Sequence, residues 1–450
     1  MKSKRITITL IILTLFGLTG AKVGALWPQQ QPVMAQNGYT PLLSGPGKAF
    51  IQQRSVPPRQ ILLERLNRRL ENNPADYEAS LLKGLLLFQA GRLPDAIAEL
   101  RGLTERAPKF QLAHLVLGDL LLARFDQVDR IGASTLLRQL DPDREKRVLE
   151  LQSEARVRLQ GYLSLLDGVQ IPRALISLGS STKYALIVDK GRNRLYVYHN
   201  PGPGLPPQLV DDFYIVLGKE TGDKFREGDL KTPNGVYHVT SYLPDEKLPP
   251  LYGSGAFPVN YPNEFDQRRA KTGNGIWLHG TDKSLYSRPP LDSEGCVVLT
   301  NEEFNRISRY IDVGRTPVII AEQVEWLNSR EWLEQTIEIQ AALELWRQKW
   351  EEADLNAYLG MYSERFWSQG HDHKSWQAHK KMVFSGKTFQ RIDLSDISVL
   401  GYPESAADQP MVVANFIQDY HSNNFNGQMR KRLYMVKEEG AWKVLYEGRQ

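Results

Sequence analysis

The chain of 450 residues contains a single cysteine, Cys296, so no disulfide bond within the chain can hold its fold together. Cysteines of exported proteins usually pair in disulfides, and the first residues here are typical of an export leader. A free cysteine is most often a small buried hydrophobe. The alternative is a nucleophile served by a histidine from elsewhere in the fold. The residues around Cys296 favour the nucleophile.

The leader is recognised from charge followed by hydrophobicity. Lys2, Lys4 and Arg5 precede an apolar stretch from residue 6 to about residue 20. This stretch is too short and too rich in threonine for a membrane span, which needs about 20 apolar residues. The pattern predicts a signal peptide within residues 1–35, and an uncleaved inner-membrane anchor is the alternative. We therefore expect an exported, periplasmic protein.

The remaining charge is balanced. The first 35 residues carry four basic and no acidic residues, so the rest of the chain has 52 of each. Without a strong positive field, we expect no nucleic-acid partner. The length predicts about three domains, and residues 36–58, rich in Gln, Gly and Pro, form the predicted linker before them.

Residues 59–165 have a helical pattern with a period of 34 residues. Glycine, alanine and proline positions carry the period: Gly84 and Gly118, Ala79 and Ala113, and Pro74, Pro108 and Pro142. The pattern resembles tetratricopeptide repeats and predicts an α-helical repeat domain, with an irregular helical bundle as the alternative. Such domains bind a protein partner or line a dimer interface, and both remain open here.

The pattern changes to strands over residues 170–322. The runs 184–189 and 194–198 are joined by a hairpin turn, and further strand-like runs follow at 213–217, 235–240, 275–279 and 316–321. We expect a mainly β domain that contains both Cys296 and His279.

Residues 333–450 begin with a predicted amphipathic helix from 333 to about 353, after which Tyr358, Tyr362 and Phe366 follow at helical spacing. Strands are predicted at 411–420, 430–437 and 442–447. Helices followed by a sheet predict an α+β cone, and the pattern resembles the nuclear-transport-factor-2-like (NTF2-like) superfamily. We expect most of its aromatic side chains to pack the helix against the sheet and a few to bind glycan or stem peptide.

Two motifs in the middle domain carry the chemistry. The first begins with Gly222-Asp223-Lys224, and the second joins the His279-Gly280-Thr281 segment to the run ending in Gly295-Cys296. Together they resemble the L,D-transpeptidase (YkuD-type) catalytic domain over about 140 residues. The resemblance implies an enzyme that cross-links or trims bacterial peptidoglycan through a cysteine acyl-enzyme, without a cofactor or a metal.

The residue types suit that chemistry. Cys296 is the predicted nucleophile, and it needs a base because a thiol is mostly protonated at neutral pH. His279 is the predicted proton donor and acceptor. Gly295 lets the backbone approach the substrate, and the N–H groups of Gly295 and Cys296 are the predicted oxyanion donors. We also expect the pKa of Cys296 to be depressed.

Other predicted site residues follow from the family pattern. Ser293 matches a position that supports the loop, and Gly280 and Thr281 match positions beside the substrate, although turn geometry also explains Gly280. Lys224 borders the cleft and would attract carboxylates. Arg288 either grips a terminal carboxylate or is an ordinary exposed arginine.

The chain departs from the family at two positions. Many members have histidine where this chain has Glu294, and an arginine or asparagine where it has Val297. We expect an L,D-transpeptidase acting on stem peptides, with an L,D-carboxypeptidase that controls cell shape as the alternative. An inactive wall-binding scaffold is the least favoured interpretation.

Overall fold

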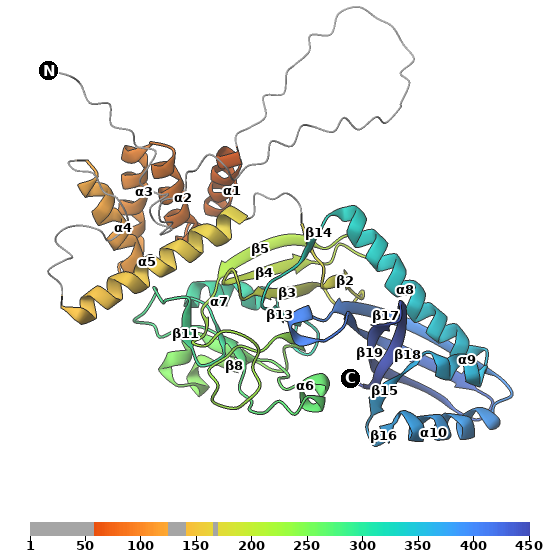
Figure 1. Ribbon diagram of the computed structural model, residues 1–450. Coiled ribbons are helices and arrows are strands. Elements are labelled where there is room, and N and C mark those ends of the chain that lie inside the picture. The colour runs from red at the N-terminus through yellow and green to blue at the C-terminus, as the bar shows by residue number, and fades with distance from the viewer. Residues whose placement is uncertain (1–57, 125–140, 165–169) are drawn as a thin grey trace, which may run out of the picture. The chain divides into compact units, whose positions relative to one another are not determined.

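The computed structural model describes residues 58–124, 141–164 and 170–450 (Figure 1). The predicted leader and most of the predicted linker lie outside these residues. Among the residues that the structure describes, no helix has both the length and the apolar composition needed to cross a bilayer. The chain divides into two compact units, one of residues up to 152 except 109–111, and one of residues 109–111 and 153–450.

The first unit is built from helices. They are α1 (Pro58–Asn72), α2 (Tyr77–Gln89), α3 (Leu93–Arg106) and α4 (Gln111–Leu122), and α5 (Pro142–Leu163) runs on into the second unit. A Cβ on Gly84 would come within 2.8 Å of the Leu100 side chain, so a larger residue would push α2 away from α3. Asp76 caps α2 by accepting a hydrogen bond from the backbone N–H of Ala79. The prediction of helical repeats is confirmed.

The second unit begins with a mainly β domain, as predicted. Its largest sheet has the order β5-β4-β3-β13-β7, formed by Gln208–Tyr214, Arg194–His199, Tyr184–Asp189, Pro317–Ala321 and Gly235–His238. A second sheet has the order β12-β10-β9-β8, formed by Val297–Val298, Trp277–His279, Gly255–Pro258 and Leu243–Pro244. A pair joins β11 (Leu291–Ser293) to β6 (Leu217–Gly218). Apolar side chains from both larger sheets form one core.

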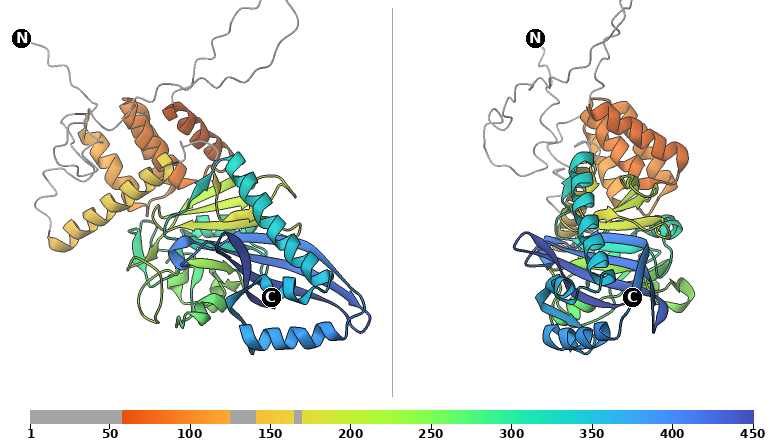
Figure 2. Two further views of the ribbon diagram at one scale, coloured as in Figure 1. Left: turned by 45° about the vertical axis from the view of Figure 1, so that its right-hand side comes forward. Right: turned by 90° about the vertical axis from the view of Figure 1, so that its right-hand side faces the viewer.

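The C-terminal part is the predicted α+β cone. Its sheet has the order β16-β15-β20-β19-β18-β17-β2. The strands are β2 (Leu175–Ser177), β15 (Tyr362–Ser368), β16 (His371–Asp372), β17 (Gln390–Gly401), β18 (Met411–Ser422), β19 (Asn426–Glu438) and β20 (Ala441–Arg449). The helices are α8 (Ser329–Glu351), α9 (Leu355–Gly360) and α10 (His373–Ser385). Helix α8 packs across β17 and β2, whereas α9 and α10 lie beside β15 (Figures 1 and 2).

One local prediction is wrong. Tyr362 and Phe366 do not continue a helix, because they lie on β15, which pairs with β20. Helix α9 ends at Gly360, and the strand gains a ladder of hydrogen bonds that the helical spacing could not reveal. Trp346, Trp350, Tyr358, Tyr362 and Trp376 all belong to one buried core, so their main role is packing, as expected.

The two parts of the second unit share structure. Strand β2 (Leu175–Ser177) precedes the catalytic strands in the sequence, yet it pairs with β17 at the edge of the C-terminal sheet. One apolar cluster combines Ile187 and Ile319 of the sheet that contains β3 and β13 with Leu400 and Met411 of the C-terminal sheet. The mainly β domain and the α+β cone are therefore joined by a common core.

Candidate active site

The turn before β12 holds Cys296. Ser293 fixes this turn with its hydroxyl, which donates to the Cys296 carbonyl at 2.7 Å and accepts from the Gly295 N–H at 3.2 Å. Gly295 has a φ of 126°, and a Cβ there would come within 2.7 Å of the Lys231 carbonyl, so only glycine fits. Because the Gly295 N–H already donates to Ser293, the geometry favours the Cys296 N–H as the oxyanion donor.

Strand pairing brings His279 toward Cys296. Strand β10 runs parallel to β12, with Leu278 opposite Val297 and His279 opposite Val298. Continued by one residue, this register sets Cys296 opposite Trp277, and residues two apart on a strand share a face. His279 therefore projects on the same face as Cys296, one step along the neighbouring strand.

The tautomer of His279 follows from its hydrogen bond. Its Nδ1 lies 2.6 Å from the Gly280 carbonyl oxygen, which can only accept a hydrogen bond. Nδ1 must therefore carry the proton, and Nε2 has a free lone pair. This is the form that a general base needs in order to take a proton from the thiol.

The thiol and the imidazole are both neutral at rest. Burial raises the pKa of Cys296 to about 11; the Trp277 backbone N–H and Lys224 oppose this rise, whereas Glu294 adds to it. Burial lowers the pKa of His279 to about 4; the Gly280 carbonyl opposes this change, whereas Arg288 adds to it. The expectation of a depressed thiol pKa is therefore wrong, because desolvation outweighs the nearby positive charge.

Lys224 and Arg288 are tied to carboxylates of their own loops. Lys224 is buried, and its Nζ donates to Asp229 Oδ1 at 2.7 Å and to the Arg226 carbonyl. Arg288 donates to Asp292 Oδ2 at 2.9 Å and to the Asp292 carbonyl at 2.7 Å. The alternative of an ordinary exposed arginine is wrong for Arg288, because its side chain is fixed and largely buried.

Gly280 and Thr281 lie in the loop directly after β10. A Cβ on Gly280 would come within 2.4 Å of Asn301 Oδ1, so close packing explains this glycine. Arg288 Nη1 donates to the Thr281 hydroxyl at 3.4 Å, which joins the two ends of the loop between β10 and β11. The predicted site residues other than Lys224 lie on β10, on β11, in the segment between these two strands and in the turn before β12, and Lys224 is close enough to lower the thiol pKa.

Sequence reasoning missed Tyr252, Trp277 and Asn301. The Tyr252 ring contacts the rings of both His279 and Trp277. Asn301 follows Thr300, which forms a capping box with Glu303 at the start of α7 (Asn301–Ile307). That capping signal marks the helix start, but nothing in it indicates that the Asn301 side chain reaches two other loops.

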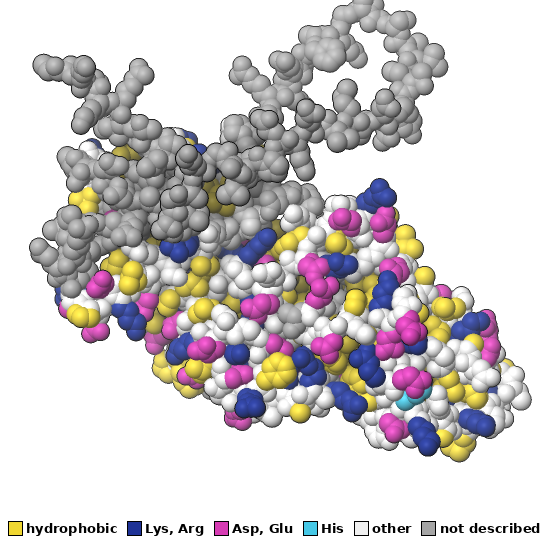
Figure 3. Space-filling model, in the orientation of Figure 1, with side chains coloured by type: hydrophobic (Ala, Val, Ile, Leu, Met, Phe, Trp, Pro, Cys, Tyr) yellow, Lys and Arg dark blue, Asp and Glu magenta, His cyan; other side chains and the backbone are white. Residues whose placement is uncertain are grey.

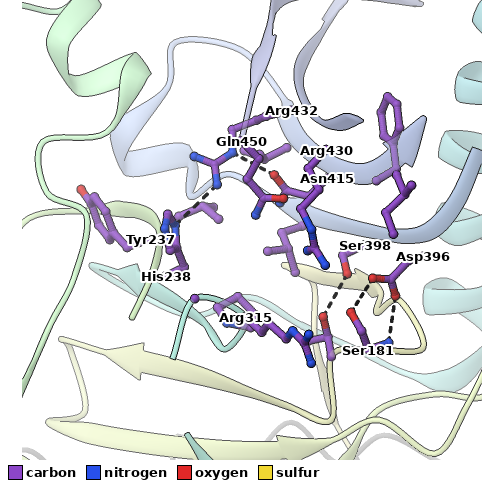
Figure 4. A pocket seen from close by; sticks show the side chains of 18 residues that line it. Ser181, Tyr237, His238, Arg315, Asp396, Ser398, Asn415, Arg430, Arg432 and Gln450 are labelled. Atoms are coloured by element: carbon purple, nitrogen blue, oxygen red, sulfur yellow. Dashed lines mark hydrogen bonds between the residues drawn. The ribbon is translucent and has the colours of Figure 1, made fainter. Parts of the chain in front are cut away.

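A separate pocket lies between β7 and the C-terminal sheet (Figure 4). In it, Arg432 donates to both carboxylate oxygens of Glu264, at 2.9 and 3.0 Å, and to Asn415 Oδ1. His238 Nδ1 lies 3.5 Å from Arg432 Nη2. Burial lowers the pKa of His238 to about 4, and Arg432 adds to this effect against the opposing charge of Glu264. The pocket holds a charged junction between the two parts of the second unit.

Away from these sites, charged side chains and possible metal ligands are dispersed. On the face drawn in Figure 3, acidic and basic side chains are interspersed over the second unit. Within residues 58–124, 141–164 and 170–450, no three side chains of the histidine, cysteine or carboxylate type come together as a metal site.

Comparison with known proteins follows the same division of the chain. The L,D-transpeptidase catalytic domain model matches residues 183–320. The solved structure of Bd1075 from Bdellovibrio bacteriovorus is 30% identical, and the likeness covers 62% of this chain and 97% of that one, with a TM-score of 0.55. The chain belongs to the YkuD-type L,D-transpeptidase family.

The regions on either side of the L,D-transpeptidase domain also resemble known domains. The Cds6 C-terminal NTF2-like domain model matches residues 338–448, and the tetratricopeptide repeat model matches 63–109 and 81–126. The helical cell shape determining protein Pgp2 of Campylobacter jejuni is 29% identical over 61% of this chain and 95% of its own, with a TM-score of 0.51. Escherichia coli YafK is 27% identical over 107 residues, which are 23% of this chain and 38% of YafK.

Proposed function

We propose that this protein is an exported peptidoglycan L,D-transpeptidase that acts on stem peptides through a Cys296 acyl-enzyme. One observation carries the proposal: the parallel pairing of β10 with β12 sets His279 on the same face as Cys296, which directly precedes β12, and Nδ1 of His279 is committed to a carbonyl. The free Nε2 then serves as the base. The family's substrate class supplies the stem peptide as the ligand.

The reaction proceeds in two halves. In the first, Sγ of Cys296 attacks the carbonyl carbon of the amide between an L-centre, such as that of a diamino acid, and D-Ala, while Nε2 of His279 takes the thiol proton. The Cys296 N–H stabilises the oxyanion. Collapse breaks the amide bond, and His279 returns the proton to the departing D-amino group. In the second half, an amine or water attacks the thioester, and the thiol is regenerated.

Hydrolysis of the thioester by water is the second candidate. The arrangement of a catalytic domain followed by an NTF2-like domain is similar to the helical cell shape determining protein Pgp2 over 95% of that protein. Trimming of stem peptides by an L,D-carboxypeptidase fits a role in cell shape. We further propose a periplasmic location and a protein partner or dimer contact through the helical repeats. An inactive scaffold has the least support, because Cys296 and His279 are both present.

Incubation of the purified protein with muropeptides tests the proposal, with the products read by mass spectrometry. Transpeptidation joins two stems with loss of D-Ala, whereas carboxypeptidation converts a tetrapeptide stem to a tripeptide and free D-Ala. Cys296→Ala should give neither product. Ser308→Ala, on the far end of α7, is the control that should keep activity. Turnover by Cys296→Ala would contradict the mechanism, and no turnover by the intact protein would contradict the function.

A further inference from the structure

Tyr252 covers the catalytic histidine from an element outside both family motifs. It ends the short 3₁₀ helix η6 (Pro250–Tyr252), between β8 and β9. Its ring meets the His279 ring nearly edge to face, with centroids 4.9 Å apart and an interplanar angle of 74°. The same ring contacts Trp277, with centroids 5.0 Å apart. Such edge-to-face contacts favour one mutual orientation of two rings.

The turn that carries Tyr252 is locked to the loop that follows His279. Asn301 Oδ1 accepts from the Ser254 N–H at 2.9 Å, and Asn301 Nδ2 donates to the Thr281 carbonyl at 2.8 Å. Gly253 has a φ of 61°, and a Cβ on it would come within 2.2 Å of the Thr281 carbonyl. The Asn301 side chain therefore fixes the distance between the turn after Tyr252 and the loop after His279.

We propose that Tyr252 is a positioning residue, whose ring holds the His279 imidazole in the orientation for proton transfer and shields it from water. The Gly280 carbonyl holds Nδ1, but one hydrogen bond leaves the ring free to tilt about it. The Tyr252 ring restrains that tilt. This inference rests on the proposed function in that His279 is taken as the base.

Few charged groups act on the side chains of His279 and Tyr252. Arg288 is the charged group whose field acts on His279. Burial raises the pKa of the Tyr252 phenol, and the negative charge of Glu294, with that of Cys296 once the thiol is ionised, raises it further. Tyr252 therefore stays neutral and acts by its ring and its bulk, next to both the base and the nucleophile.

The variants separate the ring from the hydroxyl. Tyr252→Ala removes both, Tyr252→Phe removes only the hydroxyl, and Tyr252→Leu keeps bulk without an aromatic edge. Tyr310→Ala is the matched control, because Tyr310 is also half-buried, also ends a 3₁₀ helix and also meets a ring, that of Tyr184, nearly edge to face. If Tyr252→Ala does not fold, Tyr252→Leu takes its place in the kcat comparison and Tyr252→Ser takes its place in the titration.

Two measurements on the full chain test the inference. In NMR titration of labelled histidine, uncovering the imidazole should raise the pKa of His279 in Tyr252→Ala, whereas Tyr252→Phe and Tyr310→Ala should match the intact protein. In muropeptide turnover, Tyr252→Ala should lower kcat about two- to ten-fold with little change in KM, as expected for loss of one edge-to-face contact, and Tyr252→Phe should restore it.

Three results would contradict the proposed role of Tyr252. An unchanged His279 titration in Tyr252→Ala would overturn the shielding role, and an equal loss of kcat in Tyr310→Ala would overturn the positioning role. An equal loss in Tyr252→Phe and Tyr252→Ala would assign the effect to the hydroxyl. Failure of the proposed function differs from all of these, because the intact protein would then show no turnover while the titration still reports on Tyr252.

Discussion

The Cys296 thiol should react with iodoacetamide more slowly than the thiol of an unstructured cysteine peptide. Burial raises its pKa from an ordinary value of 9.0 to about 11. At neutral pH, two pH units reduce the thiolate fraction about 100-fold. A more basic thiolate is intrinsically more nucleophilic, by about six- to ten-fold over the same interval. The net expectation is a rate on the order of ten-fold below that of the free peptide.

The assay follows the rate against pH. Because Cys296 is the single cysteine of the chain, mass spectrometry of the whole protein reports its alkylation without ambiguity. From about pH 6 to about pH 10 the rate should rise steadily without a plateau, whereas the free peptide should level off. Restricted access would lower every rate by one factor but would not move the inflection. The pH at which the rate levels off therefore isolates the pKa effect from the access effect.

Charge variants give the sign of each contribution. Glu294→Gln removes a carboxylate that raises the pKa of Cys296, so alkylation at neutral pH should be faster. Lys224→Met removes a cation that lowers it, so alkylation should be slower. Glu302→Gln, an exposed residue in the first turn of α7, is the control and should change nothing. A plateau below about pH 8 in the intact protein would refute the reasoning.

Three further predictions concern stability. His238→Gln should flatten the pH dependence of the free energy of unfolding. The pKa of His238 is about 4 in the folded state against an ordinary 6.5, so the stability that its neutral form contributes is complete above pH 6.5, and up to about 3 kcal/mol of it is lost as the pH falls to 4. Urea unfolding at about pH 7 and pH 4.5 checks this, and the same pH dependence in both proteins would contradict it. Arg432→Leu should lower the free energy of unfolding by about 3 kcal/mol, because it leaves the Glu264 carboxylate without its partner. Adding Glu264→Leu should recover part of this loss. No recovery in the double variant would argue against a stabilising ion pair between Arg432 and Glu264. Deletion of residues 333–450 should abolish cooperative unfolding of the catalytic region, because it uncovers the core that this region shares with the C-terminal sheet. If the truncated protein unfolds in calorimetry at the same temperature as the full chain, the catalytic region does not depend on that core.

Local signals account for the parts that sequence reasoning predicted well. The hairpin of β3 and β4 follows from two apolar runs around a four-residue turn, and the capping box of Thr300 and Glu303 marks the start of α7. Cys296 and His279 were found because each lies in a short motif whose residue types suit acyl transfer. Each of these features depends on residues that are close together in the chain.

Features that depend on distant pairing could not be predicted. Strand β2 joins a sheet whose next strand, β17, lies more than 200 residues further along the chain. Tyr252 reaches His279 only because Asn301 holds two loops together, and no spacing in the sequence encodes that contact. The thiol pKa was predicted with the wrong sign, because the charged neighbours are visible in the sequence whereas the extent of burial is not.

The departures from the family pattern gain a physical reason from the packing. Val297 is fully buried in the main core of the catalytic domain, so an arginine there would place a charge in apolar surroundings. The cations of the site come instead from loops: Lys224 acts on the thiol, Arg288 acts on the imidazole, and each is paired with an aspartate.

These ion pairs decide how the reaction starts. Because each cation is balanced by its own aspartate, neither can stabilise a resting thiolate strongly enough to offset desolvation. In the proposed mechanism, charge then appears only when the thiol attacks and His279 takes its proton. The orientation of His279 at that moment matters more than the resting charge, which is why the Gly280 carbonyl on one side and the Tyr252 ring on the other should control the rate.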